Sequence, residues 1–164
     1  MQNCEKLIEL VRKESDVLRR RGSLFRRISS GIEEGEVERM REACRDMEEL
    51  DEQHGRLQRE VVECLKEVCA AHGVPKESAS LGRLVEALNG DPASELASAR
   101  RDLAGALALA REAGERAERL ASVASEWNAH VLGAVWSSVP GGQTYSPAGE
   151  METPEGAVLE GAWG

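Results

Sequence analysis

The chain has 164 residues, of which 41% are hydrophobic, 31% are charged and only 3% are aromatic. Because β-sandwiches and barrels depend on aromatic and β-branched side chains, this composition argues against them and favours long helices. A formal net charge of −9 argues against a general nucleic-acid or anionic-membrane binder. The chain lacks an apolar run of membrane-spanning length, a signal-peptide core and zinc-finger cysteine spacing, so we expect a reduced, cytoplasmic protein.

The N-terminal segment predicts an amphipathic helix over residues 4–28, with Asn3 as its N-cap. One face of this helix carries a stripe of apolar residues, in which the polar Glu14 and Arg21 fill two intervening positions. Ser29-Ser30-Gly31 is expected to interrupt the helix, because serine and glycine weaken helical structure. The apolar residues of the stripe, spaced alternately by three and four, are Cys4, Leu7, Val11, Leu18, Phe25 and Ile28.

A longer helix is predicted over residues 37–71, and Gly73 and Pro75 are expected to end it. Its stripe keeps the same alternation except for a second consecutive spacing of three between Met47 and Leu50, which would overwind a supercoil locally. The positions of this stripe are Val37, Met40, Cys44, Met47, Leu50, His54, Leu57, Val61, Cys64, Val68 and Ala71.

Charge indicates that these two helices pair with each other. Residues 4–28 carry eight basic and four acidic side chains, whereas residues 33–63 carry five basic and twelve acidic ones. We therefore expect a helical hairpin with complementary rims. The arginine clusters at 19–21 and 26–27 are interpreted as solvated or salt-bridged rather than as nucleic-acid contacts.

Two further helices are predicted. Ser80 is the expected N-cap of a short helix, Leu81–Leu88, which Asn89-Gly90 ends, and Asp91-Pro92 begins the last helix. This last helix should continue to Pro140, and its many alanines would let a partner helix approach closely. Its uninterrupted alternation runs through Leu96, Ala99, Leu103, Ala106, Ala110, Ala113, Ala117, Leu120, Ala124, Trp127, Val131 and Ala134.

We therefore expect an all-α fold, an antiparallel helical bundle or coiled coil of three main helices and one short helix over residues 1–139. Residues 140–164 contain six glycines, three prolines and no lysine or arginine. Ordering about 25 residues costs on the order of 25–50 kcal/mol of backbone entropy, more than burial of the few apolar side chains there would return. This acidic tail is therefore predicted to be flexible and to order only against a partner.

The sequence offers no constellation for catalysis, a cofactor or a metal, so we expect a protein that is not an enzyme. A di-iron bundle would need two Glu-x-x-His motifs, whereas the nearest match is a single Asp51-x-x-His54. His54 is interpreted as a satisfied core histidine and His72 as a residue interacting with a helix C-terminus. Cys44 and Cys64 are interpreted as small hydrophobic residues of the seam.

The end of the last helix is the candidate binding surface, because its apolar residues cover more than one stripe of the helix. The alternatives are that the first two helices cover this surface or that the protein forms a homo-oligomer there. Four of the five aromatic residues follow residue 126, and Trp and Tyr are common interface anchors. The candidate client-binding residues are Trp127, Val131, Leu132, Val135, Trp136 and Val139.

Several features together resemble the FlgN family of flagellar type III export chaperones. They are the N-terminal amphipathic helix, the Ser30-Gly31-Ile32-Glu33-Glu34 break before a long helix, and the segment SLGRLVEAL at 80–88. The long helix with Asn128 in EWNAHVLGAVWSSV and the tail motif TYSPAGE at 144–150 complete the resemblance. A Tyr-x-x-x-Gly shortly after such a helix is the most specific of these features.

The resemblance implies a cytoplasmic, non-enzymatic chaperone without membrane insertion. Its clients would be hook–filament junction proteins like FlgK and FlgL, which it would keep unpolymerised and deliver to an export-gate protein like FlhA. Tyr145 matches the family's gate-contacting tyrosine, and the tail positions assigned to this contact are Tyr145, Gly149, Val158, Leu159 and Trp163. The alternative from another class is a structural coiled-coil protein that self-assembles through the C-terminal part of the last helix.

Overall fold

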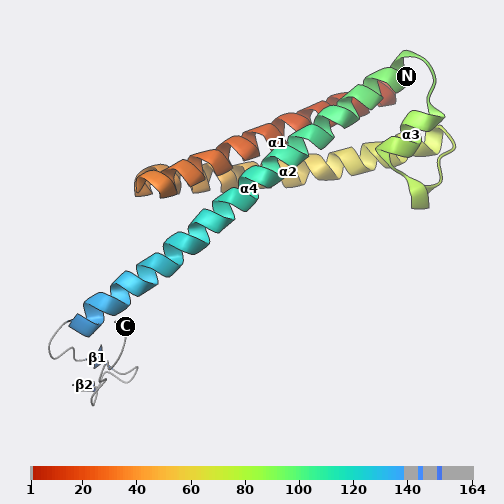
Figure 1. The fold of residues 1–164 in the computed structure, drawn as a ribbon. Coiled ribbons are helices and arrows are strands. Elements are labelled where there is room, and N and C mark those ends of the chain that lie inside the picture. The colour runs from red at the N-terminus through yellow and green to blue at the C-terminus, as the bar shows by residue number, and fades with distance from the viewer. Residues whose placement is uncertain (1, 139–143, 146–150, 153–164) are drawn as a thin grey trace, which may run out of the picture. The chain divides into compact units, whose positions relative to one another are not determined.

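The computed structural model describes residues 2–138, 144–145 and 151–152, with side chains from residue 3 to 135. Its helices are α1 (Gln2–Glu34), α2 (Val37–Ala71), the 3-10 turn η1 (Lys76–Ser78), α3 (Leu81–Ala87) and α4 (Asp91–Ser138) (Figure 1). Two strands of two residues each, β1 (Thr144–Tyr145) and β2 (Met151–Glu152), pair antiparallel. The predicted all-α fold of three long helices and one short helix is confirmed.

Contacts divide the chain into two units, Met1–Ala121 and Ser122–Gly164. The boundary falls inside α4, which is one continuous helix of 48 residues. The boundary predicted from the sequence, between a body of residues 1–139 and a tail of residues 140–164, lies further along the chain, just past the last residue of this helix. The first unit contains the helical hairpin and the buried core.

Helix α1 does not break at Ser29-Ser30-Gly31, so that prediction is wrong. The helix continues to Glu34, and the chain reverses at Gly35, whose φ is +71°. A Cβ atom on Gly31 would lie 3.2 Å from the Cβ of Met40. Gly31 therefore lets α1 and α2 approach closely beside the turn, and this packing keeps a weak helix former inside the helix. At the other end α1 begins at Gln2, so Asn3 lies inside the helix and is not its N-cap.

The expected pairing of basic α1 with acidic α2 is confirmed by two ion pairs. Arg27 Nη1 lies 2.7 Å from Asp46 Oδ2, and Arg21 Nη2 lies 3.3 Å from Asp51 Oδ1. These side chains are substantially exposed, so each pair contributes at most about 1 kcal/mol to stability. Their main effect is on which helices pair and in which register.

The α2 seam differs from the predicted one at its two ends, where Val37 and Ala71 are exposed, and at one step inside the helix. Cys44 is exposed, whereas Ala43 is fully buried, so the prediction for Cys44 is wrong. With Ala43 in the seam, the steps to Met47, Leu50 and His54 alternate regularly, and the local overwinding expected near Met47 has no basis. A small alanine is a weaker apolar signal in the sequence than a cysteine, although its position on the helix matches the seam.

The largest core cluster lies where α3 meets the N-terminal halves of α1 and α4 and the C-terminal half of α2. Its members with no measurable exposure are Leu7, Val11, Cys69, Leu84 and Leu96. The predicted cap of α3 is confirmed, because the Arg83 backbone N–H donates to Ser80 Oγ at 3.2 Å. Helix α3 is thus a short, capped segment that contributes Leu84 to this core.

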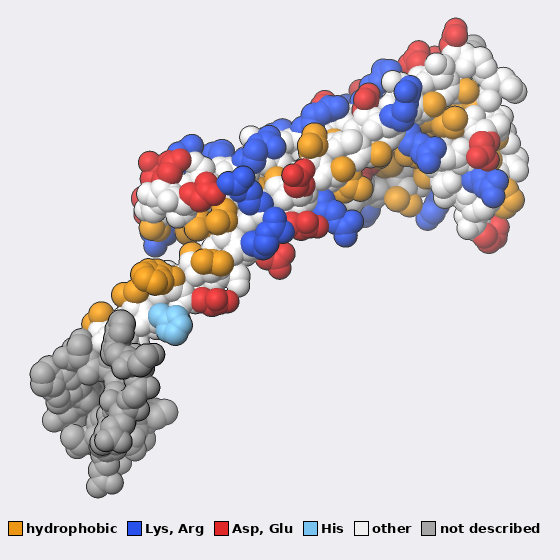
Figure 2. Space-filling model, in the orientation of Figure 1, with side chains coloured by type: hydrophobic (Ala, Val, Ile, Leu, Met, Phe, Trp, Pro, Cys, Tyr) orange, Lys and Arg blue, Asp and Glu red, His pale blue; other side chains and the backbone are white. Residues whose placement is uncertain are grey.

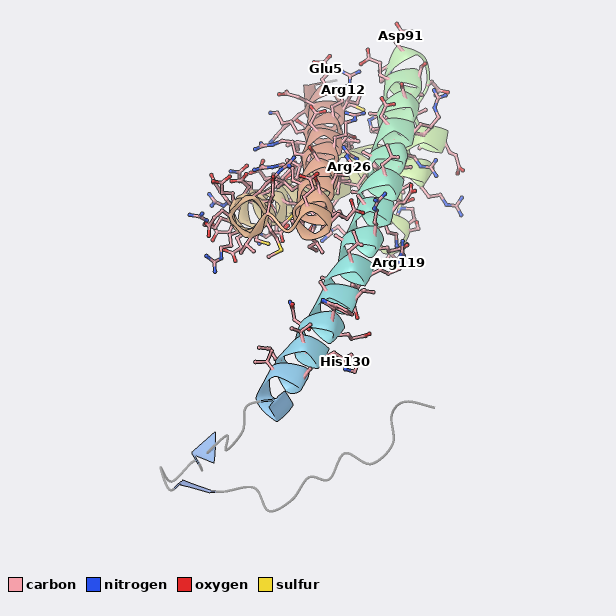
Figure 3. The ribbon with its side chains drawn as sticks, turned by 60° about the vertical axis from the view of Figure 1, so that its left-hand side comes forward. Glu5, Arg12, Arg26, Asp91, Arg119 and His130 are labelled. Atoms are coloured by element: carbon pink, nitrogen blue, oxygen red, sulfur yellow. The ribbon has the colours of Figure 1, made fainter. Side chains whose placement is uncertain are left out.

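Helix α4 runs parallel to α1 within the first unit. Arg12 pairs with Glu95 at 3.2 Å, and Arg116 pairs with Glu33 at 2.7 Å. Each pair joins an α1 residue to the α4 residue 83 positions later, as expected for two helices that run in the same direction. Figure 3 agrees, because the labelled Glu5 and Asp91 lie at the same end of the two helices. Small residues permit close packing, since a Cβ on Gly22 would lie only 3.4 Å from Ala110 Cα. The predicted alanine-rich seam is buried at Ala99, Ala106, Ala110 and Ala117.

Candidate protein-binding surface

The predicted client-binding residues of the last helix lie on an exposed part of α4. Although the three-and-four alternation continues to Ala134, burial of the seam does not: Trp127 is 68% exposed and Val131 is 42% exposed. We call Val123, Trp127, Val131 and Leu132 the α4 stripe. Val123, Trp127 and Val131 follow one another at intervals of four residues, and each interval turns about 40° around the helix. The stripe therefore winds along the helix surface.

The other predicted residues of this surface are described less fully. Val135, the next position at the same interval, is 52% exposed. Trp136 belongs to α4, but its side chain lies outside the described residues, as does the whole of Val139. Figure 2 shows apolar side chains, in orange, along this part of α4.

Charge is nearly absent from the sequence that carries the stripe. Between residues 122 and 138, Glu126 is the only acidic residue, His130 is the only histidine, and lysine and arginine do not occur. Scattered exposed leucines are ordinary on protein surfaces, whereas a contiguous uncharged patch marks an interaction surface. A tryptophan beside branched aliphatic side chains is the composition of a helix that anchors a protein partner.

A second apolar feature lies within the first unit and was not predicted. A groove of about 610 Å³ runs between α1 and α4. Arg21 from α1 and Arg111 and Glu118 from α4 contribute its charged groups. Its apolar lining is formed by Leu18, Phe25 and Ile28 of α1 and by Leu107, Ala110, Gly114, Ala117 and Ala121 of α4. We call this feature the α1–α4 groove.

The shape of the groove follows from pairing large residues on α1 with small ones on α4. A Cβ on Gly114 would lie 3.1 Å from the Phe25 ring, so the ring rests against backbone. The Arg21 guanidinium carbon lies 5.8 Å from the centre of the same ring, within cation–π range. In the sequence, the groove is indicated by Leu107, an apolar residue of α4 that lies outside the predicted seam. In the structure Leu107 is 54% exposed and lines the groove.

The tail residues assigned to an export-gate contact fall mostly outside the described structure. Tyr145 belongs to β1, where its backbone is in register with Met151 of β2. The side chain of Tyr145 and the residues Gly149, Val158, Leu159 and Trp163 lie outside the described residues.

The described histidine and cysteine side chains form no reactive cluster. Among residues 3–135, no group of three or more His, Cys, Asp or Glu side chains is arranged to hold a metal ion. Cys64 is buried in the seam, as predicted, and its Sγ lies 3.7 Å from the Asn3 carbonyl oxygen. Burial raises the pKa of Cys4, Cys64 and Cys69, so these thiols stay protonated at neutral pH.

Native-state alkylation with iodoacetamide is expected to modify Cys44 first and to leave the three buried thiols unmodified, with four sites modified in denaturant. The reason is exposure of Cys44 together with the raised pKa of the other three. Burial raises the pKa of these three thiols above their value in the unfolded chain. The free energy of unfolding is therefore also expected to fall as the pH rises above the ordinary thiol pKa. Intact-mass spectrometry measures the labelling, Cys44→Ser is the control, and rapid native labelling of Cys64 would contradict the buried seam.

His54 lies in the hairpin seam as predicted, but it is not satisfied there. It is 8% exposed, and its Nε2 atom has no hydrogen-bond partner in the described part of the chain. The carboxylate oxygen facing it is Glu14 Oε1 of α1 at 3.6 Å, beyond hydrogen-bond distance. The pair is therefore a buried polar contact inside an otherwise apolar seam. His72 is exposed at the C-cap of α2, near the position expected for it.

The fold and this surface define an all-helical protein with an exposed apolar helix segment and an apolar groove. Comparison with known proteins finds no matching family model, curated protein or solved structure. Within the described residues, no helix combines the length and the apolar character that crossing a membrane requires.

Proposed function

We propose that this protein is a non-enzymatic export chaperone of the flagellar type III kind, which covers an amphipathic helix of its client with the α4 stripe. The observation that carries the proposal is the exposure of Trp127, Val131 and Leu132 on a helix segment with a single carboxylate. The resemblance of the sequence to FlgN-type chaperones supplies the client class, hook–filament junction proteins like FlgK and FlgL. Subunits of this kind would polymerise through helices that need a temporary partner.

The energetics suit a partner that must be released. Full burial of one large apolar side chain is worth about 1.5–3 kcal/mol, and association costs several kcal/mol in lost freedom. A stripe of four such residues therefore supports moderate affinity, in which Trp127 supplies the largest contact area. A client helix with an apolar face would pack on the stripe, against which no other described helix packs.

The tail would act at a later step. Tyr145 and Gly149 carry the motif that resembles the gate-contacting motif of the family, and Val158, Leu159 and Trp163 are further apolar positions of the tail. In this proposal the helix segment holds the client while the tail contacts an export-gate protein like FlhA. The two contacts use different residues and can be tested separately.

Co-expression with a hook–filament junction protein from the same organism tests the proposal. Tagged full-length chain is expected to capture the client, and Trp127→Glu with Leu132→Glu is expected to weaken capture at least tenfold, because charge replaces the central contacts. Leu109→Glu is the matched control, since Leu109 is an exposed leucine of α4, 60% accessible, outside the stripe. A chain truncated after Pro140 separates the tail's contribution from that of the helix. Unchanged capture by both the stripe variant and the truncation would refute the proposal.

A further inference from the structure

We infer that the α4 stripe of one copy docks into the α1–α4 groove of a second copy, so that the free protein masks its client surface as a symmetric dimer. The inference rests on the proposed function only where it says that the masked surface is the client surface. Its physical basis is that one chain carries both an exposed apolar helix segment and an apolar groove. Each of these features is complete within the described residues of its own unit.

The length of the α4 stripe and the size of the α1–α4 groove match each other. The α1 wall of the groove extends from Leu18 to Ile28, about 15 Å at the helical rise, and the stripe from Val123 to Leu132 is about 14 Å long. Ala110 and Ala117 are buried at the base of the groove, whereas Leu107, which is 54% exposed, and the exposed Ala121 are open to contact with side chains from a partner. A volume of about 610 Å³ is in the range of sites that enclose a drug-sized molecule, so an indole ring and neighbouring aliphatic groups can enter.

Charge favours this particular occupant. Arg21 and Arg111 line the groove, against one carboxylate, Glu118. Arg111 pairs with Glu115 at 3.6 Å, and both side chains are largely exposed, so Arg111 is accessible to a partner. The helix segment that carries the stripe has one charged residue, Glu126. Because Arg21 already pairs with Asp51 at 3.3 Å, Arg111 is the groove cation that a partner would meet. A second copy offers it the carboxylate of Glu126.

Reciprocal docking also limits the assembly. If each copy inserts its stripe into the groove of the other, the two contacts are identical and the assembly closes at two copies. Both apolar surfaces are then covered in the absence of client, which prevents open-ended aggregation. A client helix would compete with the second copy for the stripe, so the apparent client affinity would fall as the chaperone concentration rises.

Sedimentation velocity of the full chain and its variants tests the inference. The wild-type protein is expected to be a dimer at micromolar concentration. Leu107→Glu alters the groove and Trp127→Glu alters the stripe, and each is expected to weaken dimerisation at least tenfold. Leu109→Glu, on the same helix but outside the groove lining, should remain dimeric. All three positions are exposed, and far-UV circular dichroism verifies that the helices are retained.

Mixing the two monomeric variants gives the decisive result. Leu107→Glu retains an intact stripe and Trp127→Glu retains an intact groove, so an equimolar mixture is expected to form a weaker heterodimer with one intact contact. A wild-type monomer at every concentration would overturn the inference. So would a dimer that survives Leu107→Glu but not Trp127→Glu, because it would show stripe packed against stripe.

Client capture separates this inference from the proposed function. Monomeric Leu107→Glu retains its stripe and is expected to capture a hook–filament junction protein at least as well as the wild type. If sedimentation shows the expected dimer and monomers but neither the wild type nor any variant captures client, the dimer stands and the proposed function fails. If capture follows the stripe but the wild type is monomeric, the proposed function stands and the dimer fails.

Discussion

Replacing Glu14 and His54 together by leucine is expected to stabilise the protein by about 1–4 kcal/mol, as found when buried polar pairs give way to well-packed apolar residues. The two side chains face each other across the α1–α2 seam with exposed fractions of 13% and 10%. His54 Nε2 is buried without a hydrogen-bond partner in the described part of the chain, and the 3.6 Å separation from Glu14 Oε1 gives it no hydrogen bond. Leucine has a similar volume and would continue the apolar seam formed by Val11, Leu18 and Leu50.

Urea denaturation followed by far-UV circular dichroism at neutral pH measures this effect. The single variant His54→Leu should be less stable than the double variant, because it leaves the Glu14 carboxylate in the seam without a polar neighbour. A matched control is Glu52→Ala with Arg56→Ala, an exposed pair on α2 at 3.5 Å, which should leave the midpoint nearly unchanged. A double leucine variant less stable than the wild type would show that the pair contributes net stability.

Leu84→Ala is expected to destabilise the protein by about 2–5 kcal/mol, a large part of the 5–15 kcal/mol that stabilises a typical domain. Leu84 is fully buried, and it is the buried residue of the seven-residue helix α3. It packs in the cluster that joins α1, α2 and α4, so its loss leaves a cavity where all of these helices meet.

Thermal denaturation measures the total loss, and hydrogen exchange shows where it acts. Exchange should rise first in α3 and in the N-terminal turns of α4, because a helix this short has little stability without tertiary packing. Val85→Ala is the control, since Val85 lies on the same helix but is only partly buried. A change below about 1 kcal/mol for Leu84→Ala would mean that α3 does not hold the core together.

Local features of the fold could be predicted well from the sequence, because they depend on residues within one or two helical turns. Ser80 caps α3 as expected, α2 ends just before Gly73, and α4 begins at Asp91. The charge difference between the first two helices correctly predicted their pairing, as Arg27 and Asp46 show. The same local reasoning was wrong at Gly31, where contact with Met40 from the next helix outweighs the weak helix propensity of glycine.

The helices, their apolar stripes and the helix segment that carries the candidate binding surface follow from the local sequence pattern. Which positions of a stripe are covered depends on the packing of other helices against it. The alternation from Leu96 to Ala134 is uninterrupted, yet Ala117 is buried and Trp127 is exposed, and Ala43 rather than Cys44 joins the seam. The α1–α4 groove likewise arises where two helices distant in sequence meet. Periodicity reports which residues share a face of one helix, whereas burial depends on what other segments place against that face.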